Sequence, residues 1–121
     1  MKHASKAFLV GRDVVLEDVG DGIRRQILGY DRSLLVARVE FDAGARGDVH
    51  AHPHSQVSYV ESGEFLVSID GKEQLLGPGD SFYVEPHLDH GAVCQKSGVL
   101  LDVFSPVRED FFLSRGMTRE R

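Results

Sequence analysis

Short apolar runs separated by glycine-containing turns dominate the middle of this chain. Within residues 33–41, every second residue is apolar: Leu35, Ala37, Val39 and Phe41. This alternation has a period of two, which is typical of a strand with one buried face. Similar short runs recur along the chain, and such a series predicts an all-β sandwich or barrel.

The boundaries of these runs predict where the strands lie. Beyond residues 33–41, we expect strands at 56–61, 64–69, 72–76, 81–84, 91–95 and 99–104, with weaker candidates at 6–10 and 22–30. Asp70-Gly71 lies between two apolar runs, which is the favoured signal for a tight hairpin, so 72–76 should return antiparallel.

The end of the chain carries the one helical signal. Ser105 is suited to an N-cap and Pro106 to the first helical position, which predicts a short helix over about 107–115. A length of 121 residues supports a single domain, 1–121, with a core barrel over about 22–105.

Composition excludes several classes of protein. A hydrophobic content of 41% supports a packed core, and a net charge of -5 argues against a nucleic-acid-binding surface. The single cysteine excludes a disulfide framework and a cysteine-cluster zinc site. Apolar segments are too short for a secretory signal or a membrane span, so we expect a cytoplasmic protein without membrane or nucleic-acid partners.

Five of the six histidines lie between positions 50 and 90. If a strand runs through His50 and His52, the two imidazoles point to the same side, because residues two apart share a face. Gln56 begins the next predicted strand and His90 follows a turn. These four side chains are suitable ligands for a first-row divalent metal ion. The alternative is that they are exposed polar residues in loops.

Two further histidines fit this pattern less well. His54 and His87 each follow a proline, in predicted bends. We expect them to line a pocket or to support a metal ligand through a hydrogen bond.

The spacing around the first histidines resembles the first motif of the cupin family. That motif is Gly, five residues, His-x-His, three or four residues, Glu, six residues, Gly. Here Gly44, His50, His52, Gln56 and Gly63 occupy those positions, with glutamine in place of glutamate. The resemblance implies a jelly-roll barrel, or double-stranded β-helix, with one bound divalent metal ion: nickel, zinc, iron, manganese or cobalt. Because the ligand set would be neutral, it favours Lewis-acid chemistry over redox chemistry.

The second cupin motif is matched in part. Gly79 and His90 have the expected separation, but Glu85, His87 and Cys94 stand where proline, glycine and asparagine are usual. The metal-binding histidine is kept, while the turn before it departs from the pattern.

A second group of reactive side chains follows near the C-terminus. Asp102 and Phe104 share one face of the predicted strand 99–104, and Arg108 lies shortly beyond. Taken singly, each fits an ordinary role: an edge-strand acid, a core aromatic and a solvated arginine. Together they suit a proton-transfer group, a contact for a sugar ring and a clamp for a carboxylate.

Over residues 22–112 the chain also resembles the KdgF-type cupins of pectin and alginate breakdown. The shared motifs run from His50 to Gln56, then through 58–60, 63–65, 79–81, 90–91, 100–104, Pro106 and 108–111. In that family glutamine is the usual fourth ligand, which accounts for Gln56.

This resemblance implies a reaction, namely the linearisation of 4,5-unsaturated monouronates to 4-deoxy-5-keto uronates. Arg108 would bind the substrate carboxylate, Asp102 would transfer a proton and Phe104 would pack on the ring. The family also implies a homodimer. Alternatives are another cupin enzyme, such as a dioxygenase or a sugar isomerase, or a non-catalytic sugar-binding cupin. The sequence does not distinguish pectin-derived from alginate-derived substrates.

Overall fold

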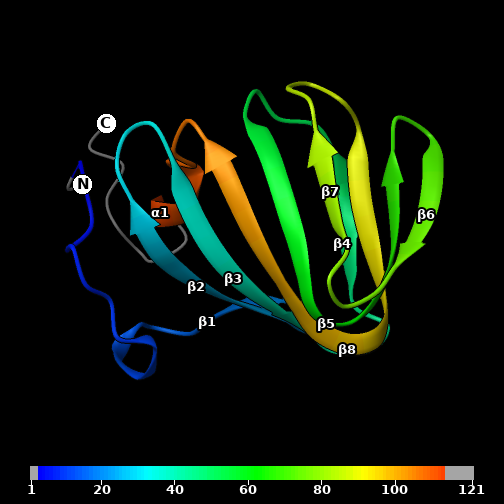
Figure 1. Ribbon diagram of the computed structural model, residues 1–121, viewed down its shortest axis with the longest axis horizontal. Helices are drawn as coiled ribbons and strands as arrows, with labels where there is room; N and C mark the ends of the chain where they lie inside the picture. Colours follow the sequence, from blue (N-terminus) through cyan, green and yellow to red (C-terminus); the bar gives the residue numbers. More distant parts are fainter. Residues whose placement is uncertain (1–2, 114–121) are drawn as a thin grey trace.

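The chain folds into one eight-stranded, antiparallel sheet (Figure 1). The computed structural model describes residues 3–113. The strands are β1 (Glu17–Gly20), β2 (Ile23–Tyr30), β3 (Leu35–Phe41), β4 (Arg46–His50), β5 (Ser55–Ile69), β6 (Lys72–Leu76), β7 (Ser81–Val84) and β8 (His90–Ser105). A 3-10 helix, η1 (Gly11–Asp13), precedes them, and a short helix, α1 (Asp110–Leu113), follows them. The all-β prediction is confirmed.

Two long strands, β5 and β8, pair with each other along almost their whole length. Near Ser55 and Ser105 they form one wall with β1, β2, β3 and β7, and at their other ends they form a second wall with β4 and β6. Figure 1 shows the sheet curling at the point where β5 and β8 bend. The same two strands therefore serve both walls of the barrel.

Two facing glycines allow this bend. Gly63 has a φ of 81°, and a Cβ atom on it would lie 2.6 Å from the Cα of Gly98 on β8. The pairing register shifts on both sides of Ser62, so Ser62-Gly63 forms a bulge and not a turn. The separate strands expected at 56–61 and 64–69 are therefore one strand, and so are those expected at 91–95 and 99–104.

The interior is apolar, and β3 shows why. Its residues alternate between buried and partly exposed, and the buried ones are Leu35, Ala37, Val39 and Phe41. Phe41 meets the fully buried Phe65 of β5 edge to face, with ring centres 5.1 Å apart. Each fully buried side chain of this size contributes about 1.5–3 kcal/mol to stability.

The predicted C-terminal helix begins later than expected. It begins at Asp110, because the preceding segment packs as irregular chain: Val107 is buried, and its N–H donates to the Arg32 carbonyl. Ser105 ends β8 and does not cap a helix, so that prediction is wrong. Residues 114–115 lie outside the described residues.

The prediction of a weak strand at 6–10 is also wrong. That segment has no strand pairing, and Phe8 remains 87% exposed. It is held by its neighbour Ser5, whose N–H donates to the Tyr30 carbonyl. Among residues 3–113, no helix has the length and apolar character needed to cross a membrane.

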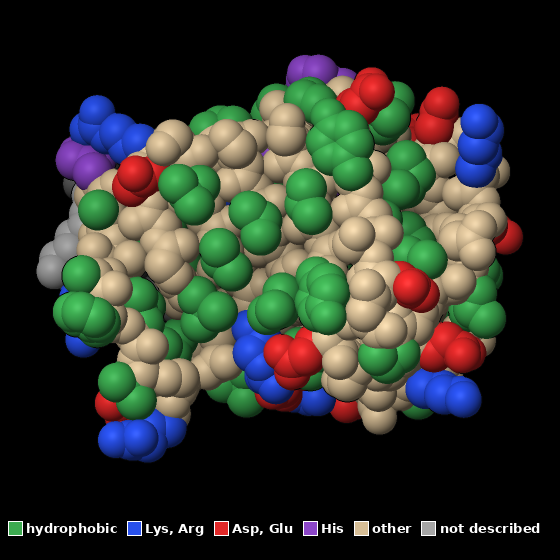
Figure 2. All heavy atoms as spheres, viewed as in Figure 1, with side chains coloured by type: hydrophobic (Ala, Val, Ile, Leu, Met, Phe, Trp, Pro, Cys, Tyr) green, Lys and Arg blue, Asp and Glu red, His purple; other side chains and the backbone are tan. Residues whose placement is uncertain are grey.

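The outer face of the wall formed by β3, β8, β5 and β7 is rich in apolar side chains. Val103 is aligned with Val36 and Val57 on its two neighbours, and Val57 is aligned with Tyr83. Val57, Tyr59, Tyr83 and Val103 are exposed. Figure 2 shows hydrophobic side chains gathered across this face.

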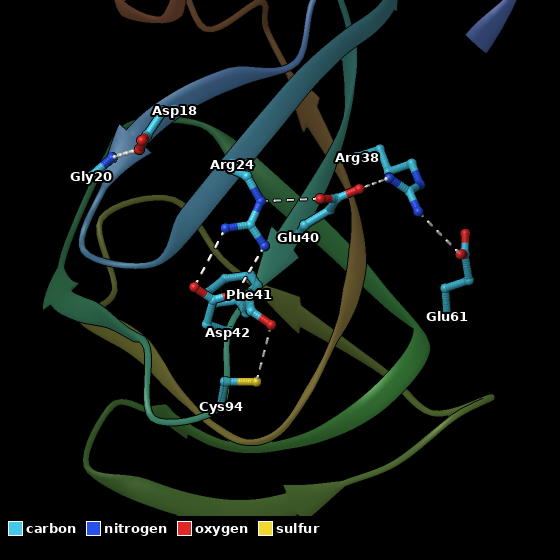
Figure 3. A network of polar contacts seen from close by, with 9 residues as sticks. All are labelled: Asp18, Gly20, Arg24, Arg38, Glu40, Phe41, Asp42, Glu61 and Cys94. Carbon is cyan, nitrogen blue, oxygen red and sulfur yellow. Dashed lines mark hydrogen bonds and ion pairs between the residues drawn. The ribbon is translucent and has the colours of Figure 1, made fainter. Parts of the chain in front are cut away.

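Charged residues on β2, β3 and β5 form a network (Figure 3). Arg24 pairs with Glu40 at 3.2 Å and with Asp42 at 2.9 Å, while Arg38 pairs with Glu40 at 2.6 Å and lies 3.9 Å from Glu61. These pairs connect β2, β3 and β5 on the outside of the barrel. None of these residues lines the cavity beside the histidines, so the network is a structural feature of the wall.

Candidate metal centre and pocket

Three histidines converge inside the barrel where β4 and β8 meet. His50 and His90 are aligned partners on these two strands, with ring centres 4.5 Å apart, and the His52 ring lies 4.7 Å from that of His90. One ring nitrogen from each of the three lies within 4.8 Å of the others. The strand expected through both His50 and His52 ends at His50. His52 nevertheless faces the same point, because the loop is held by a 2.7 Å bond from the His87 N–H to the His52 carbonyl.

Backbone carbonyls hold all three rings in one orientation. The Nδ1 atoms of His50, His52 and His90 lie 2.8, 3.1 and 3.0 Å from the carbonyl oxygens of Asp48, His54 and Leu88. A carbonyl only accepts, so each Nδ1 carries the hydrogen and each Nε2 keeps its lone pair. This is the arrangement by which proteins orient histidine ligands on a metal ion.

Burial favours the neutral form of two of these rings. It lowers the pKa of His52 and of His90, because the charged imidazolium is poorly solvated there. The His90 Nε2 is buried and has no hydrogen-bond partner among the described residues. A buried acceptor without a donor is costly, and a bound cation would remove that cost.

Gln56 supplies an oxygen to the same point. It is buried on β5, and its Oε1 lies 3.0 Å from the His52 Nε2. With the His52 hydrogen on Nδ1, this contact joins two acceptors, which is favourable only with a cation beside both. A separation of 3.0 Å would let both atoms lie at a usual ligand distance of about 2.1 Å from one ion. The four side chains thus fit a single divalent metal ion.

A cavity of about 210 Å³ adjoins this centre. It brings together His50, Gln56, His90, Asp102, Phe104 and Arg108. Six of the seven residues predicted as metal ligands or as substrate-contacting or catalytic groups thus line one space. The seventh, His52, lies against it, with its ring centre 5.8 Å from that of Phe104. The cavity is large enough for a small molecule beside the candidate metal ligands.

Asp102 has the environment of an acid–base group. It lies on β8, and its Oδ1 accepts a 2.6 Å hydrogen bond from the Ser58 hydroxyl. Burial raises the pKa of Asp102 to about 6, although the bond from Ser58 and the charge of Arg108 act in the opposite direction. A carboxyl group with this pKa exchanges a proton readily near neutral pH.

Arg108 reaches the cavity from the segment between β8 and α1. The centre of its guanidinium lies 4.9 Å from the Phe104 ring centre and 4.4 Å from that of Phe111. Its Nε and one terminal nitrogen donate to the two oxygens of Asp110, at 3.0 and 2.7 Å. Arg108 therefore already holds a carboxylate in the two-point manner that an acidic substrate would use.

A second arginine, Arg25, lines the same cavity and was missed in the sequence. Its guanidinium centre lies 3.9 Å from the Phe111 ring centre, and its Nε lies 3.5 Å from Glu17. Arg25 is aligned with the buried Val39, so it occupies an inward position of β2. In the sequence, Arg25 lies between Ile23 and Ile27 at alternating positions. This pattern places Arg25 on the inward face of β2 once that face is known.

His54 and His87 lie around the site. His54 contributes the carbonyl that holds His52, and its own Nε2 lies 3.2 Å from the Val107 carbonyl. His87 is exposed, with a φ of 71°, and Glu85 before it is also exposed. Neither histidine belongs to the group of converging ligand nitrogens among the described residues.

Comparison with known proteins identifies the family. The model of the cupin domain matches residues 37–104, which include all four candidate ligands and Asp102. The chain belongs to the cupin family. Within that family, it is 37% identical over 108 residues to the pectin degradation protein KdgF of Dickeya dadantii (strain 3937). The match covers 88% of this cupin and 98% of that protein, so the resemblance to KdgF-type cupins is confirmed.

Solved cupin structures agree with this assignment. An RmlC-like cupin from Shewanella frigidimarina NCIMB 400 is 53% identical, with a TM-score of 0.90 over 91% of this cupin and 99% of that chain. KdgF from Halomonas sp. is 37% identical, with a TM-score of 0.84 over 88% and 99% of the two chains. A predicted oxalate decarboxylase from Thermotoga maritima shares the fold. It is 16% identical, with a TM-score of 0.74 over 83% of this cupin and 99% of that chain.

Proposed function

We propose that this cupin linearises 4,5-unsaturated monouronates to 4-deoxy-5-keto uronates. The observation that carries the proposal is Asp102, a carboxyl group with a pKa of about 6 in the same cavity as the histidine cluster and Arg108. Similarity to a protein named for pectin degradation supports a uronate substrate. We extend the proposal to uronates from alginate, because both polymers yield unsaturated uronates when lyases cleave them.

His50, His52, Gln56 and His90 would hold one divalent ion, which we propose to be nickel, zinc, iron, manganese or cobalt. When bound, such an ion supplies Lewis acidity beside the substrate oxygens. The ligand candidates carry no negative charge, so the whole charge of the ion would act on whatever lies next to it. The absence of a carboxylate from this set also argues against the two-histidine, one-carboxylate arrangement of many oxygenases.

The protein side chains would divide the remaining tasks. Arg108 would exchange Asp110 for the substrate carboxylate, and Phe104 would pack against the ring. Asp102 would accept the proton of the C1 hydroxyl as the bond between C1 and the ring oxygen breaks. This step leaves an aldehyde at C1 and an enolate at C5. Return of this proton from Asp102 to C4 then gives the 5-keto product. No atoms are gained or lost overall, so the reaction is an isomerisation.

The direct test follows the double bond of the substrate. Freshly prepared 4,5-unsaturated galacturonate and mannuronate are mixed with metal-loaded protein, and the ultraviolet absorbance of the double bond is recorded. We expect the absorbance to fall faster than in the spontaneous reaction. An unchanged rate with both sugars would overturn the proposal, and oxygen consumption instead would indicate a dioxygenase. Binding of the sugars without turnover would indicate a sugar-binding module.

We also propose that the protein is a homodimer. The exposed apolar side chains on the wall of β3, β8, β5 and β7 support this, because large apolar patches on soluble proteins often mark interfaces (Figure 2). Sedimentation equilibrium should give twice the monomer mass, and Tyr83→Glu should shift the mass toward the monomer. A monomer mass for the wild-type protein would contradict the proposal.

A further inference from the structure

Ser58 lies between the metal centre and Asp102. Its side chain is fully buried on β5, two residues after Gln56, and it is the aligned partner of Asp102 on β8. The Gln56 Nε2 lies 2.9 Å from the Ser58 Oγ, and that Oγ lies 2.6 Å from the Asp102 Oδ1. A continuous chain of hydrogen bonds therefore joins a metal-ligand candidate to the candidate proton-transfer group.

The direction of each hydrogen bond in this chain is fixed by chemistry. An amide nitrogen has only hydrogens to offer, so Gln56 donates and the Ser58 oxygen accepts. An ionised carboxylate only accepts, so the Ser58 hydroxyl gives its one hydrogen to Asp102. With both bonds made, the Gln56 Oε1 is left facing His52, where a metal ion would need it.

The opposite arrangement reverses every bond. If the Gln56 amide turned over, its oxygen would face Ser58 and would take the hydroxyl hydrogen. Asp102 would then lose its donor and could keep a bond to Ser58 only by being protonated and donating to it. In that state the Gln56 amide nitrogen faces the histidines, and an amide nitrogen does not bind a metal ion. One hydroxyl thus selects between two internally consistent states.

We infer that Ser58 is a positioning residue that couples the metal-binding orientation of Gln56 to the ionised form of Asp102. The role of Asp102 in this inference rests on the proposed function. The coupling between Gln56 and Asp102 does not. It predicts a reciprocal effect: whatever stabilises the Gln56 oxygen toward the histidines also favours the Asp102 carboxylate. A serine that only filled space would show no such effect.

The test compares Ser58→Ala, which removes both bonds, with Ser58→Thr, which keeps the hydroxyl. Nickel(II) binding to the metal-free protein is measured by titration calorimetry, and Asp102 is titrated by carboxyl-carbon NMR, both without substrate. In Ser58→Ala we expect nickel affinity to fall by about 10–100-fold, the typical effect of losing a hydrogen bond that supports a ligand. We also expect the pKa of Asp102 to rise, because the bond from Ser58 lowers it. Ser58→Thr should restore both properties.

The exposed Ser81 on β7 provides the matched control, and Ser81→Ala should change neither reading. If Ser58→Ala does not fold, Ser58→Cys replaces it, because a thiol is a weak donor and acceptor of similar size. Wild-type affinity and an unshifted Asp102 titration in the folded variant would overturn the inference. The proposed function is tested separately. If Ser58→Ala changes nickel affinity and the Asp102 titration as expected, but the wild-type protein does not accelerate linearisation, only the proposed function is refuted.

Discussion

The guanidinium of Arg108 is bound at two points by the carboxylate of Asp110, through hydrogen bonds of 3.0 and 2.7 Å. The arginine side chain is only 11% exposed, whereas that of Asp110 is 56% exposed. The pair therefore presents a buried cation whose partner faces solvent. An anionic substrate that binds Arg108 through the same two nitrogens must displace this partner.

Weakening that pair should favour the substrate. A partly exposed ion pair is worth about 0.2–1 kcal/mol, so Asp110→Asn should lower KM for the unsaturated uronate by up to about fivefold. The rate at saturating substrate should change little. Steady-state kinetics at low salt would measure this, with Glu109→Gln as the control for the change in charge. A higher KM in Asp110→Asn would show that Asp110 positions Arg108 and does not compete with the substrate.

Removing the acid–base function of Asp102 should abolish most of the rate. General acid–base groups contribute about 10²–10⁴-fold, so Asp102→Asn should lower kcat by that factor. The asparagine oxygen can still accept the Ser58 hydroxyl hydrogen, so the variant should keep its metal. Stopped-flow absorbance and elemental analysis would test the two statements together. Full activity in this variant would remove Asp102 from the mechanism.

The pH dependence should report the same group. Because burial raises the pKa of Asp102 to about 6, the carboxylate needed to accept the first proton is depleted below that pH. For the metal-saturated protein, kcat/KM should rise with pH through about 6 and level off above it. In Asp102→Asn, the residual kcat/KM should not show this rise with pH. A profile that falls through pH 6 would mean that the protonated acid acts first.

Metal binding should depend on the converging histidines and not on histidine content as such. The double variant His50→Ala/His52→Ala should lose stoichiometric metal, whereas His87→Ala, at an exposed position outside the cluster, should retain it. Elemental analysis after dialysis against metal-free buffer distinguishes them. Equal metal content in both variants would place the site elsewhere.

The bend in the two long strands should be intolerant of side chains. A Cβ atom at Gly98 would overlap the Ser62 carbonyl oxygen, whereas one at Gly77 would meet nothing within 4 Å. Overpacking against rigid backbone costs about 1–3 kcal/mol or more, so Gly98→Ala should unfold at lower urea concentration, and Gly77→Ala should not. Similar midpoints for the two variants would show that the bend can relax.

Local sequence signals predicted the parts of the fold that local chemistry decides. The Asp70-Gly71 hairpin has the expected return strand, 72–76, because the turn itself sets that geometry. Ser62-Gly63 carries a similar signal but forms a bulge, because both flanking segments pair with β8. That pairing is a long-range property, which the sequence around Gly63 does not contain.

The same distinction applies to the site. The histidines and Gln56 were visible because a metal site needs particular residue types at particular spacings. Ser58 and Arg25 were not, because serine and arginine are ordinary residues whose role depends on which face of a strand is buried. The helix expected from 107 was overridden by a tertiary contact, the bond from Val107 to the Arg32 carbonyl.

The shared strands β5 and β8 also separate two kinds of task. Gln56, Ser58, His90 and Asp102 all lie on this central pair, where each strand is bonded on both sides for much of its length. Arg108 lies beyond the end of β8, in the connection to α1. The residues that we propose hold the metal ion and transfer the proton are thus part of the frame of the barrel, and Arg108, which we propose exchanges Asp110 for the substrate carboxylate, lies at its margin. Substrate preference can then change at the margin while the chemistry at the centre stays intact.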